Sequence, residues 1–148
     1  MTELLGAWRL ESWSFLYEDG RRPEFPMGPD AQGYLLYTPT GQVSATIMRA
    51  DRSQCFAYAG RYEITDGTVF HLIELSTNPA LIGVRSTRHI ALDGDRLTLS
   101  GPDFLPAIRR SQRIVWRRAT GSAQGRPDGR ASRRGVSSQS SRALRTRA

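Results

Sequence analysis

A histidine and an arginine lie in strand-like segments at positions where apolar residues are expected. His71 alternates with Val69, Ile73 and Leu75, and Arg88 alternates with Ile90. Because every second residue of a strand faces the same side of a sheet, both polar side chains are predicted to point into the core. A buried imidazole can act as a general acid or base. A buried guanidinium requires a carboxylate, several carbonyl oxygens or an anionic ligand.

Three hydroxyl-bearing residues, Tyr58, Tyr62 and Ser86, fall on the same predicted interior face. With His71 and Arg88 they would form a polar patch in an apolar cavity, which is how a small-molecule site fixes the orientation of its ligand. In a catalytic interpretation, His71 exchanges a proton while Tyr58 or Tyr62 polarises an oxygen of the substrate. The candidate catalytic residues are therefore His71, Tyr58 and Tyr62.

The candidate ligand-binding set adds the large side chains that would line such a cavity. It comprises Trp8, Tyr34, Tyr58, Tyr62, His71, Ile73, Ser86 and Arg88. In a purely structural alternative, His71 is a core histidine with satisfied hydrogen bonds, and Arg88 pairs with Glu11 or Glu74. Both interpretations stay open at this point, because a bulge in either strand would reverse the face that each side chain occupies.

Established catalytic and metal-binding signatures are absent from the chain. It has no Gly-x-Ser-x-Gly elbow, no phosphate-cradling glycine loop and no dinucleotide fingerprint. Its two histidines, His71 and His89, fall in opposite phases, and its single cysteine, Cys55, lies in a connector. Three or four converging metal ligands are not evident. We therefore expect neither a cofactor nor a metal site.

The elements that position these residues are predicted to be strands throughout, with no helix. Asp66-Gly67 separates two β-rich runs, and such a pair is the strongest short-range signal of a hairpin. Evenly spaced hairpins indicate an antiparallel meander, and eight strands suffice to close a barrel around one small ligand. The sequence predicts an all-β, up-and-down barrel of about eight antiparallel strands, at 5–17, 33–38, 42–48, 58–65, 68–75, 83–92, 96–100 and 110–118.

Two irregularities are expected within this pattern. The aromatic residues of the first strand change phase between Trp8 and Trp13, which predicts a bulge near Glu11. Residues 21–32 hold three prolines and are predicted to form a loop across one end of the fold. Phe25 and Met27 would pack inward from it, either as a plug or as ordinary loop anchors.

Charge is distributed unevenly along the 148 residues. Of the net charge of +7, residues 1–119 contribute +1, from 14 arginines and 13 acids, whereas residues 120–148 contribute +6, from seven arginines and one aspartate. The latter segment has no aromatic residue and is rich in Ser, Gly and Arg, so we predict a barrel domain at 1–119 and a disordered tail at 120–148. A nucleic-acid partner would involve only this tail, which lacks interleaved aromatic residues for stacking on bases.

The compartment and assembly of the protein are predicted from simple features. One cysteine excludes an intramolecular disulfide, and the N-terminus shows no secretory pattern. No run of apolar residues is long enough for a membrane-spanning helix. We expect a cytoplasmic protein with no membrane partner, and an open barrel edge could be closed by a second copy in a homodimer.

Several blocks of the sequence carry a resemblance to a known family. The blocks are LLGAWRLESW, GYLLYTPTGQVSATIM, YAGRYEITDGTVFHLIELSTNPALIG, LDGDRLTLS and IVWRR. They cover most of residues 4–118 and resemble the bacterial and fungal lipocalin-like domain family. The resemblance implies a small β-barrel with a central cavity and no cofactor. The family's pattern of histidine, glutamate, serine, proline and glycine is similar to His71, Glu74, Ser76, Pro79 and Gly83 here.

The chain departs from the family pattern in two places. The connector at 49–56 is shorter than the insertion usual in the family, so an element that would cover the barrel mouth is missing. Leu81 stands where the family favours an aromatic residue after the Asn-Pro pair.

The function favoured by these features is binding of a small hydrophobic or amphipathic metabolite in the barrel cavity. An alternative is a cofactor-independent isomerase, cyclase or hydratase that uses His71 in the same cavity. A third is an interaction module that works through the basic tail.

Overall fold

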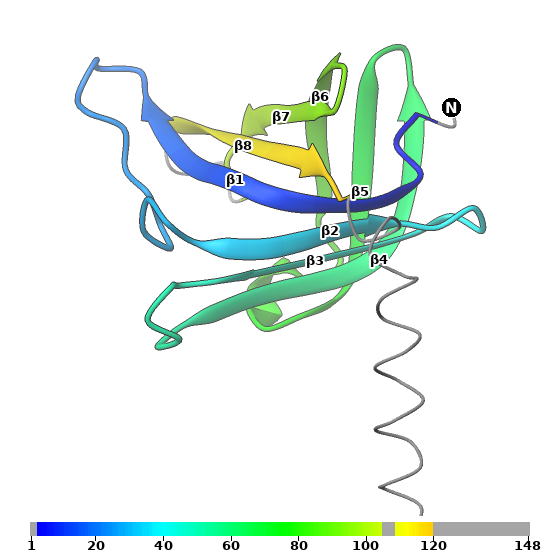
Figure 1. Cartoon of the computed structure of the whole chain (residues 1–148), viewed down its shortest axis with the longest axis horizontal. Helices are drawn as coiled ribbons and strands as arrows, with labels where there is room; N and C mark the ends of the chain where they lie inside the picture. Colours follow the sequence, from blue (N-terminus) through cyan, green and yellow to red (C-terminus); the bar gives the residue numbers. More distant parts are fainter. Residues whose placement is uncertain (1–2, 105–108, 120–148) are drawn as a thin grey trace, which may run out of the picture. The chain divides into compact units, whose positions relative to one another are not determined.

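The computed structural model shows a closed barrel of eight antiparallel strands, in which each strand pairs with its neighbour in sequence and the last pairs with the first (Figure 1). It describes residues 3–104 and 109–119, so the tail predicted at 120–148 lies outside the described residues. The strands are β1 (Gly6–Tyr17), β2 (Gln32–Tyr37), β3 (Gln42–Met48), β4 (Cys55–Thr65), β5 (Thr68–Ser76), β6 (Arg85–Asp93), β7 (Arg96–Pro102) and β8 (Arg110–Arg118).

The predicted meander is confirmed, with small differences at the ends of elements. In the β4–β5 turn, Asp66 and Gly67 both have positive φ, 48° and 77°, as expected of this pair. β4 begins at Cys55, within the predicted connector, because Cys55 pairs with Met48 of β3. The described residues also include one short 3-10 helix, η1 (Pro79–Leu81), which the sequence pattern does not predict. Among the described residues, no helix is both long and apolar enough to cross a membrane.

Two bulges decide which side chains face the interior. The predicted bulge in β1 is confirmed, because the pairing with β8 shifts between Leu10 and Ser12 and leaves Glu11 unpaired. A second bulge in β5, at Glu74, was not predicted. There the pairing with β4 shifts, so that Gly60 lies opposite Ile73. The prediction that Leu75 shares the interior face of His71 is therefore wrong: the extra residue turns Leu75 outward, and it is 67% exposed.

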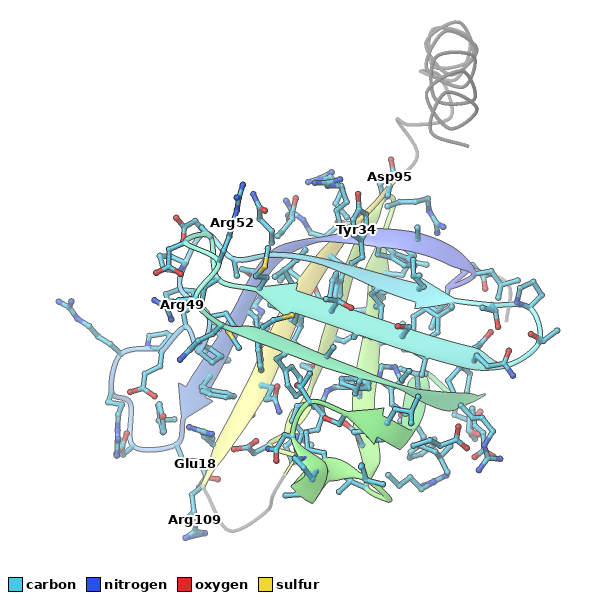
Figure 2. The ribbon with its side chains drawn as sticks, turned by 90° about the horizontal axis from the view of Figure 1, so that it is seen from below. Glu18, Tyr34, Arg49, Arg52, Asp95 and Arg109 are labelled. Atoms are coloured by element: carbon cyan, nitrogen blue, oxygen red, sulfur yellow. The ribbon has the colours of Figure 1, made fainter. Side chains whose placement is uncertain are left out.

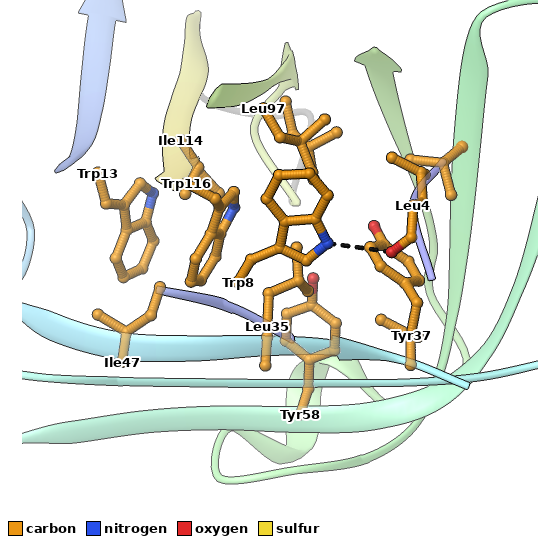
Figure 3. Close-up of a cluster of buried hydrophobic side chains, with 14 of the residues drawn as sticks. Leu4, Trp8, Trp13, Leu35, Tyr37, Ile47, Tyr58, Leu97, Ile114 and Trp116 are labelled. Carbon is orange, nitrogen blue, oxygen red and sulfur yellow. Dashed lines mark hydrogen bonds between the residues drawn. The ribbon is translucent and has the colours of Figure 1, made fainter. Parts of the chain in front are cut away.

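The core fills the barrel with large side chains from all eight strands. Trp8 and Trp116 are fully buried, and Trp13 is nearly so (Figure 3). The indole N–H of Trp8 donates to the carbonyl oxygen of Leu4 over 3.0 Å, so this buried donor is satisfied. Because β1 bends at its bulge, tryptophans on both sides of Glu11 point into the same core.

The loop before β2 only partly matches its prediction. An isolated bridge between Phe15 and Glu24 holds the loop against β1. Met27 packs against the core and is partly buried, as expected. Phe25 was also expected to pack inward, but it is 42% exposed. The loop thus supplies one anchor and no aromatic plug.

The β5 bulge generates a prediction about stability at Gly60. A Cβ added to this residue would lie 1.9 Å from the carbonyl oxygen of Leu72, because the bulge brings β5 against β4. We expect Gly60→Ala to reduce the free energy of unfolding by about 3 kcal/mol, as in overpacked cores. Urea unfolding followed by circular dichroism measures this change.

Gly94→Ala is the matched control. Gly94 has a positive φ of 61° but open space around it, so the cost there is backbone strain of only about 1 kcal/mol. Equal losses at the two positions would show that the backbone contact at Gly60 is not the limiting constraint.

Candidate functional site

A row of three hydrogen-bonded side chains crosses the barrel interior. The Tyr37 hydroxyl lies 2.7 Å from Nε2 of His71, and the Tyr58 hydroxyl lies 2.7 Å from Nδ1 of the same ring. These residues come from β2, β5 and β4, and His71 is only 1% exposed. The predicted interior positions of His71 and Tyr58 are therefore confirmed. A neutral imidazole has one donor and one acceptor nitrogen, so one tyrosine accepts from the ring and the other donates to it.

All three groups are neutral near neutral pH. Burial, followed by the positive charge of Arg88, lowers the pKa of His71 from 6.5 to about 3. Burial raises the pKa of Tyr58 to about 12, although Arg88 opposes this rise. Burial also places the pKa of Tyr37 well above its usual value. The row has no free ring nitrogen, so the alternative in which His71 is a satisfied core histidine agrees with this geometry.

The sequence predicts Tyr34 as a ligand-binding residue of β2, but Tyr37 is the tyrosine of this strand that bonds to His71. Tyr34 lies on the outer face, 46% exposed, where its hydroxyl accepts from Arg9 over 2.5 Å (Figure 2). Its predicted ligand-binding role is therefore corrected. Leu35 and Tyr37 face the interior instead, because β2 pairs with β1 and β3 in the register that turns them inward.

The remaining predicted residues occupy different parts of the interior. Tyr62 is half-buried and donates to the carbonyl oxygen of Thr38 over 2.8 Å, so it bonds to the backbone and not to His71. Its ring packs edge-on against Tyr37 at 4.8 Å between centroids. Trp8, Ile73 and Ser86 are buried as predicted, and Ser86 pairs in register with His71.

Arg88 is buried, with 1% of its surface exposed. Its Nη1 donates to the carbonyl oxygens of Thr87 and Pro102 over 2.7 and 3.1 Å. Burial lowers the pKa of Arg88, while electrostatic interactions with Tyr58 and Asp103 oppose that change. Its Cζ lies 4.8 Å from the ring centroid of Phe104.

The alternative ion pairs proposed for Arg88 are wrong. Glu11 bonds to Arg117 over 2.6 Å and also pairs with Arg96. Glu74 pairs with Arg61 over 3.0 Å. Neither carboxylate is buried, so neither compensates the charge of Arg88 within the barrel.

A pocket of about 230 Å³ opens beside this interior cluster. Its wall is largely aromatic, and Trp13 stacks on Phe56 with 5.5 Å between ring centroids. Phe56 and Phe104 each contact the ring of Tyr58, at 5.8 Å, so they separate the pocket from the His71 row. The apolar lining residues are Trp13, Phe15, Met27, Phe56, Leu81 and Phe104, and the polar ones are Asn78, Asp103 and Arg110.

A hydrogen-bond network forms the polar side of the pocket. The fully buried Gln112 accepts from the Trp13 indole over 2.8 Å and donates to Asp103 over 3.4 Å. The other oxygen of Asp103 accepts from Nε of Arg110 over 2.6 Å, and Arg110 also donates to the Tyr17 hydroxyl over 3.1 Å. Each charged group of this wall is thus paired and held in position.

None of the eight predicted ligand-binding residues is among those lining the pocket. The alternation of Trp13 and Phe15 after the β1 bulge indicates that both side chains face the interior. This part of the pocket wall could therefore have been predicted from the sequence. Phe56 was assigned to the connector, and Asp103 and Phe104 to a loop, where periodicity gives no face. The catalytic roles of His71, Tyr58 and Tyr62 stay predictions. Within residues 3–104 and 109–119, no three His, Cys, Asp or Glu side chains gather as a metal site requires.

A closed antiparallel barrel with an aromatic pocket and a buried polar cluster defines a lipocalin-like architecture. The lipocalin-like domain model matches residues 5–57 and 53–119. This chain belongs to the lipocalin-like domain family.

Comparisons with individual proteins add less. No curated protein matches the chain. Among solved structures, it is similar to the crystal structure of a lipoprotein YedD from Klebsiella pneumoniae subsp. pneumoniae MGH 78578. The sequence identity is 14%, the match covers 88% of this chain and 87% of that one, and the TM-score is 0.41.

The buried histidine generates a prediction about pH. Between pH 6.5 and about 3, the unfolded chain binds a proton at His71 that the folded barrel excludes. The free energy of unfolding should therefore fall as the pH drops through this window, by about 1.4 kcal/mol per pH unit from this group. His71→Gln should remove that part of the slope, measured by urea unfolding from neutral pH down to about pH 5.

His89→Gln is the control for this measurement, because His89 is exposed on the outside of β6. It should keep the wild-type slope. If His71→Gln also keeps it, His71 accepts a proton in the folded state and is not held neutral by burial.

Proposed function

We propose that this protein binds a small hydrophobic or amphipathic molecule in the aromatic pocket at the end of the barrel. The observation that carries the proposal is the pocket itself, in which six apolar side chains face three polar ones. Ligand sites commonly combine a mainly apolar wall with a few fixed polar groups. Membership of the lipocalin-like family agrees with such a role.

The size of the pocket favours a compact ligand. Its volume of about 230 Å³ is below the range of roughly 300–1,000 Å³ that is typical of drug-sized ligands. A medium-length alkyl chain or a compact aromatic molecule suits this space better than a long lipid. Stacking against Trp13 and Phe56 also favours a flat or flexible apolar body.

The polar wall would fix the orientation of the ligand. Asp103 and Arg110 neutralise one another at 2.6 Å, so this part of the wall presents a polar but nearly uncharged surface. It suits a hydroxyl or carbonyl group of the ligand near the pocket entrance.

Catalysis in the same cavity has less support. Both ring nitrogens of His71 already bond to tyrosines, and Phe56 and Phe104 stand between His71 and the pocket. A substrate would have to displace a tyrosine hydroxyl before His71 exchanged a proton with it.

The pocket is tested by filling it. Met27→Trp places a larger side chain in the apolar wall, and we expect it to weaken binding of the neutral dye N-phenylnaphthylamine by about tenfold, because the dye loses its space. The enhancement of dye fluorescence on titration into the full-length protein measures the affinity.

Phe25→Trp is the matched control, since Phe25 lies in the same loop but outside the pocket and is exposed. It should bind the dye like the wild type. Equal affinity of all three proteins, or no binding to the wild type, would contradict the proposed site.

A further inference from the structure

We propose that Arg88 receives a carboxylate of the bound molecule, so that the ligand is a small amphipathic carboxylic acid. This inference rests on the proposed function, because the apolar body of the acid would occupy the aromatic pocket. Beyond the proposed function, the inference specifies the charge and the chemical class of the ligand. It also assigns the binding of the acid group to Arg88, which lies behind the pocket wall.

The guanidinium of Arg88 is hydrogen-bonded on one side, whereas its other side, called the open edge below, has no hydrogen-bond partner among the described residues. Nη1 is held by the carbonyl oxygens of Thr87 and Pro102. Nε and Nη2 are fully buried and have no hydrogen-bond partner among the residues that the structure describes. The N–H groups of Nε and Nη2 point in parallel, and this edge of a guanidinium matches the two oxygens of a carboxylate. The open edge is therefore the one suited to bidentate binding of an acid.

The backbone at Gly101 leaves room for the anchored side of the guanidinium. Gly101 lies on β7 beside the guanidinium, and a Cβ there would come within 2.4 Å of the Thr87 carbonyl oxygen and 3.3 Å of Nη1. A larger residue would push against the anchored side of Arg88. The absence of a side chain at this position lets Nη1 approach β7, where it donates to the carbonyl oxygen of Pro102.

The charge of Arg88 has no carboxylate bonded to it in the described part of the barrel. Asp103 is close enough to influence its pKa, but both oxygens of Asp103 bond to Arg110 and Gln112. Tyr37, Tyr58 and His71 are neutral and do not balance a positive charge. A desolvated cation in this state is costly, and an anionic ligand would compensate it.

A second orphaned group lies next to Arg88. Four buried side-chain polar atoms lack a partner among the described residues, and three of them belong to Ser86 and Arg88, with Trp116 holding the fourth. Ser86 and Arg88 are two residues apart on β6, so their side chains lie on the same face. The Ser86 hydroxyl is a further donor for an acid group bound at Arg88.

Phe104 stands between the pocket and Arg88. Its ring lines the pocket and also lies 4.8 Å from Cζ of Arg88. This cation–π contact partly stabilises the guanidinium, but more weakly than a bidentate carboxylate would. Because Nε and Nη2 are buried, the Phe104 ring would have to move before a molecule in the pocket could reach this edge of Arg88. An acid could then keep its chain against Trp13 and Phe56 while its carboxylate binds behind them.

A matched pair of probes, octanoate and octanol, separates the acid group from the apolar chain. Their affinities for the full-length protein are measured by isothermal titration calorimetry at neutral pH. We expect the wild type to bind octanoate about tenfold more tightly than octanol, because charge-assisted hydrogen bonds add to the contribution of the chain. Arg88→Met should lose this preference while its affinity for octanol stays within about twofold of the wild type.

Arg85→Met is the matched control, since Arg85 lies on the same strand, faces outward and packs on Phe70. It should retain the preference for octanoate. Arg88→Lys keeps the charge without the parallel donors and should lose most of the preference. It also serves as the test if circular dichroism shows that Arg88→Met does not fold.

The outcomes separate the two proposals. Equal affinity of the wild type for octanoate and octanol, or a preference that survives in both Arg88 variants, would overturn the role of Arg88 and leave the pocket intact. Binding of N-phenylnaphthylamine without binding of octanoate would also overturn it. If the wild type binds none of the three probes, the proposed function fails, and the role of Arg88 fails with it.

Discussion

Pairing of β1 with β8 closes the barrel, and the arrangement of the interior depends on this closure. β1 runs alongside β8 for almost its whole length. β1 bends at Glu11, so its two halves belong to different parts of the barrel wall. The bend keeps Trp8 and Trp13 on the inside on either side of the unpaired residue. Closure leaves no free sheet edge and removes the interior from water, so every polar side chain inside must find a partner there.

The polar side chains of the interior differ in how completely their hydrogen bonds are satisfied. His71 has both nitrogens bonded, Gln112 links Trp13 to Asp103, and Asp103 is paired with Arg110. Among the described residues, Arg88 finds hydrogen-bond partners for only one edge of its guanidinium. A desolvated cation with unpaired donors does not make the folded state more stable than an apolar side chain of similar size would, because such a replacement often leaves stability unchanged or raises it. Stability alone therefore does not explain why an arginine occupies this position. The half-bonded Arg88 is therefore the interior feature that points most directly to a ligand.

The fold was largely predictable from the sequence, because alternation and Asp-Gly pairs mark strands and hairpins locally. The interior positions of His71 and Arg88 followed from the same alternation. Tyr37 did not, because GYLLY is apolar at almost every position and so gives no phase for β2. Nothing in the residue types around Glu74 indicates the bulge there. The bulge turns the Leu75 side chain outward, opposite to its predicted direction. The pocket wall escaped prediction because it joins segments far apart in the chain, such as Trp13 and Phe104, and periodicity contains no information about which loops meet.

The Tyr37–His71–Tyr58 row also has a mechanical meaning. β2 and β5 are separated by two strands in the barrel wall, so the hydrogen bond between Tyr37 and His71 spans the interior as a chord across its cross-section. A tube braced in this way resists flattening at the level of the brace. This hydrogen bond opposes a change of the barrel cross-section to an oval shape. Any widening falls to the side chains at the pocket end, such as Met27 and Phe104, so the proposed binding would select ligands by shape at the rim of the barrel.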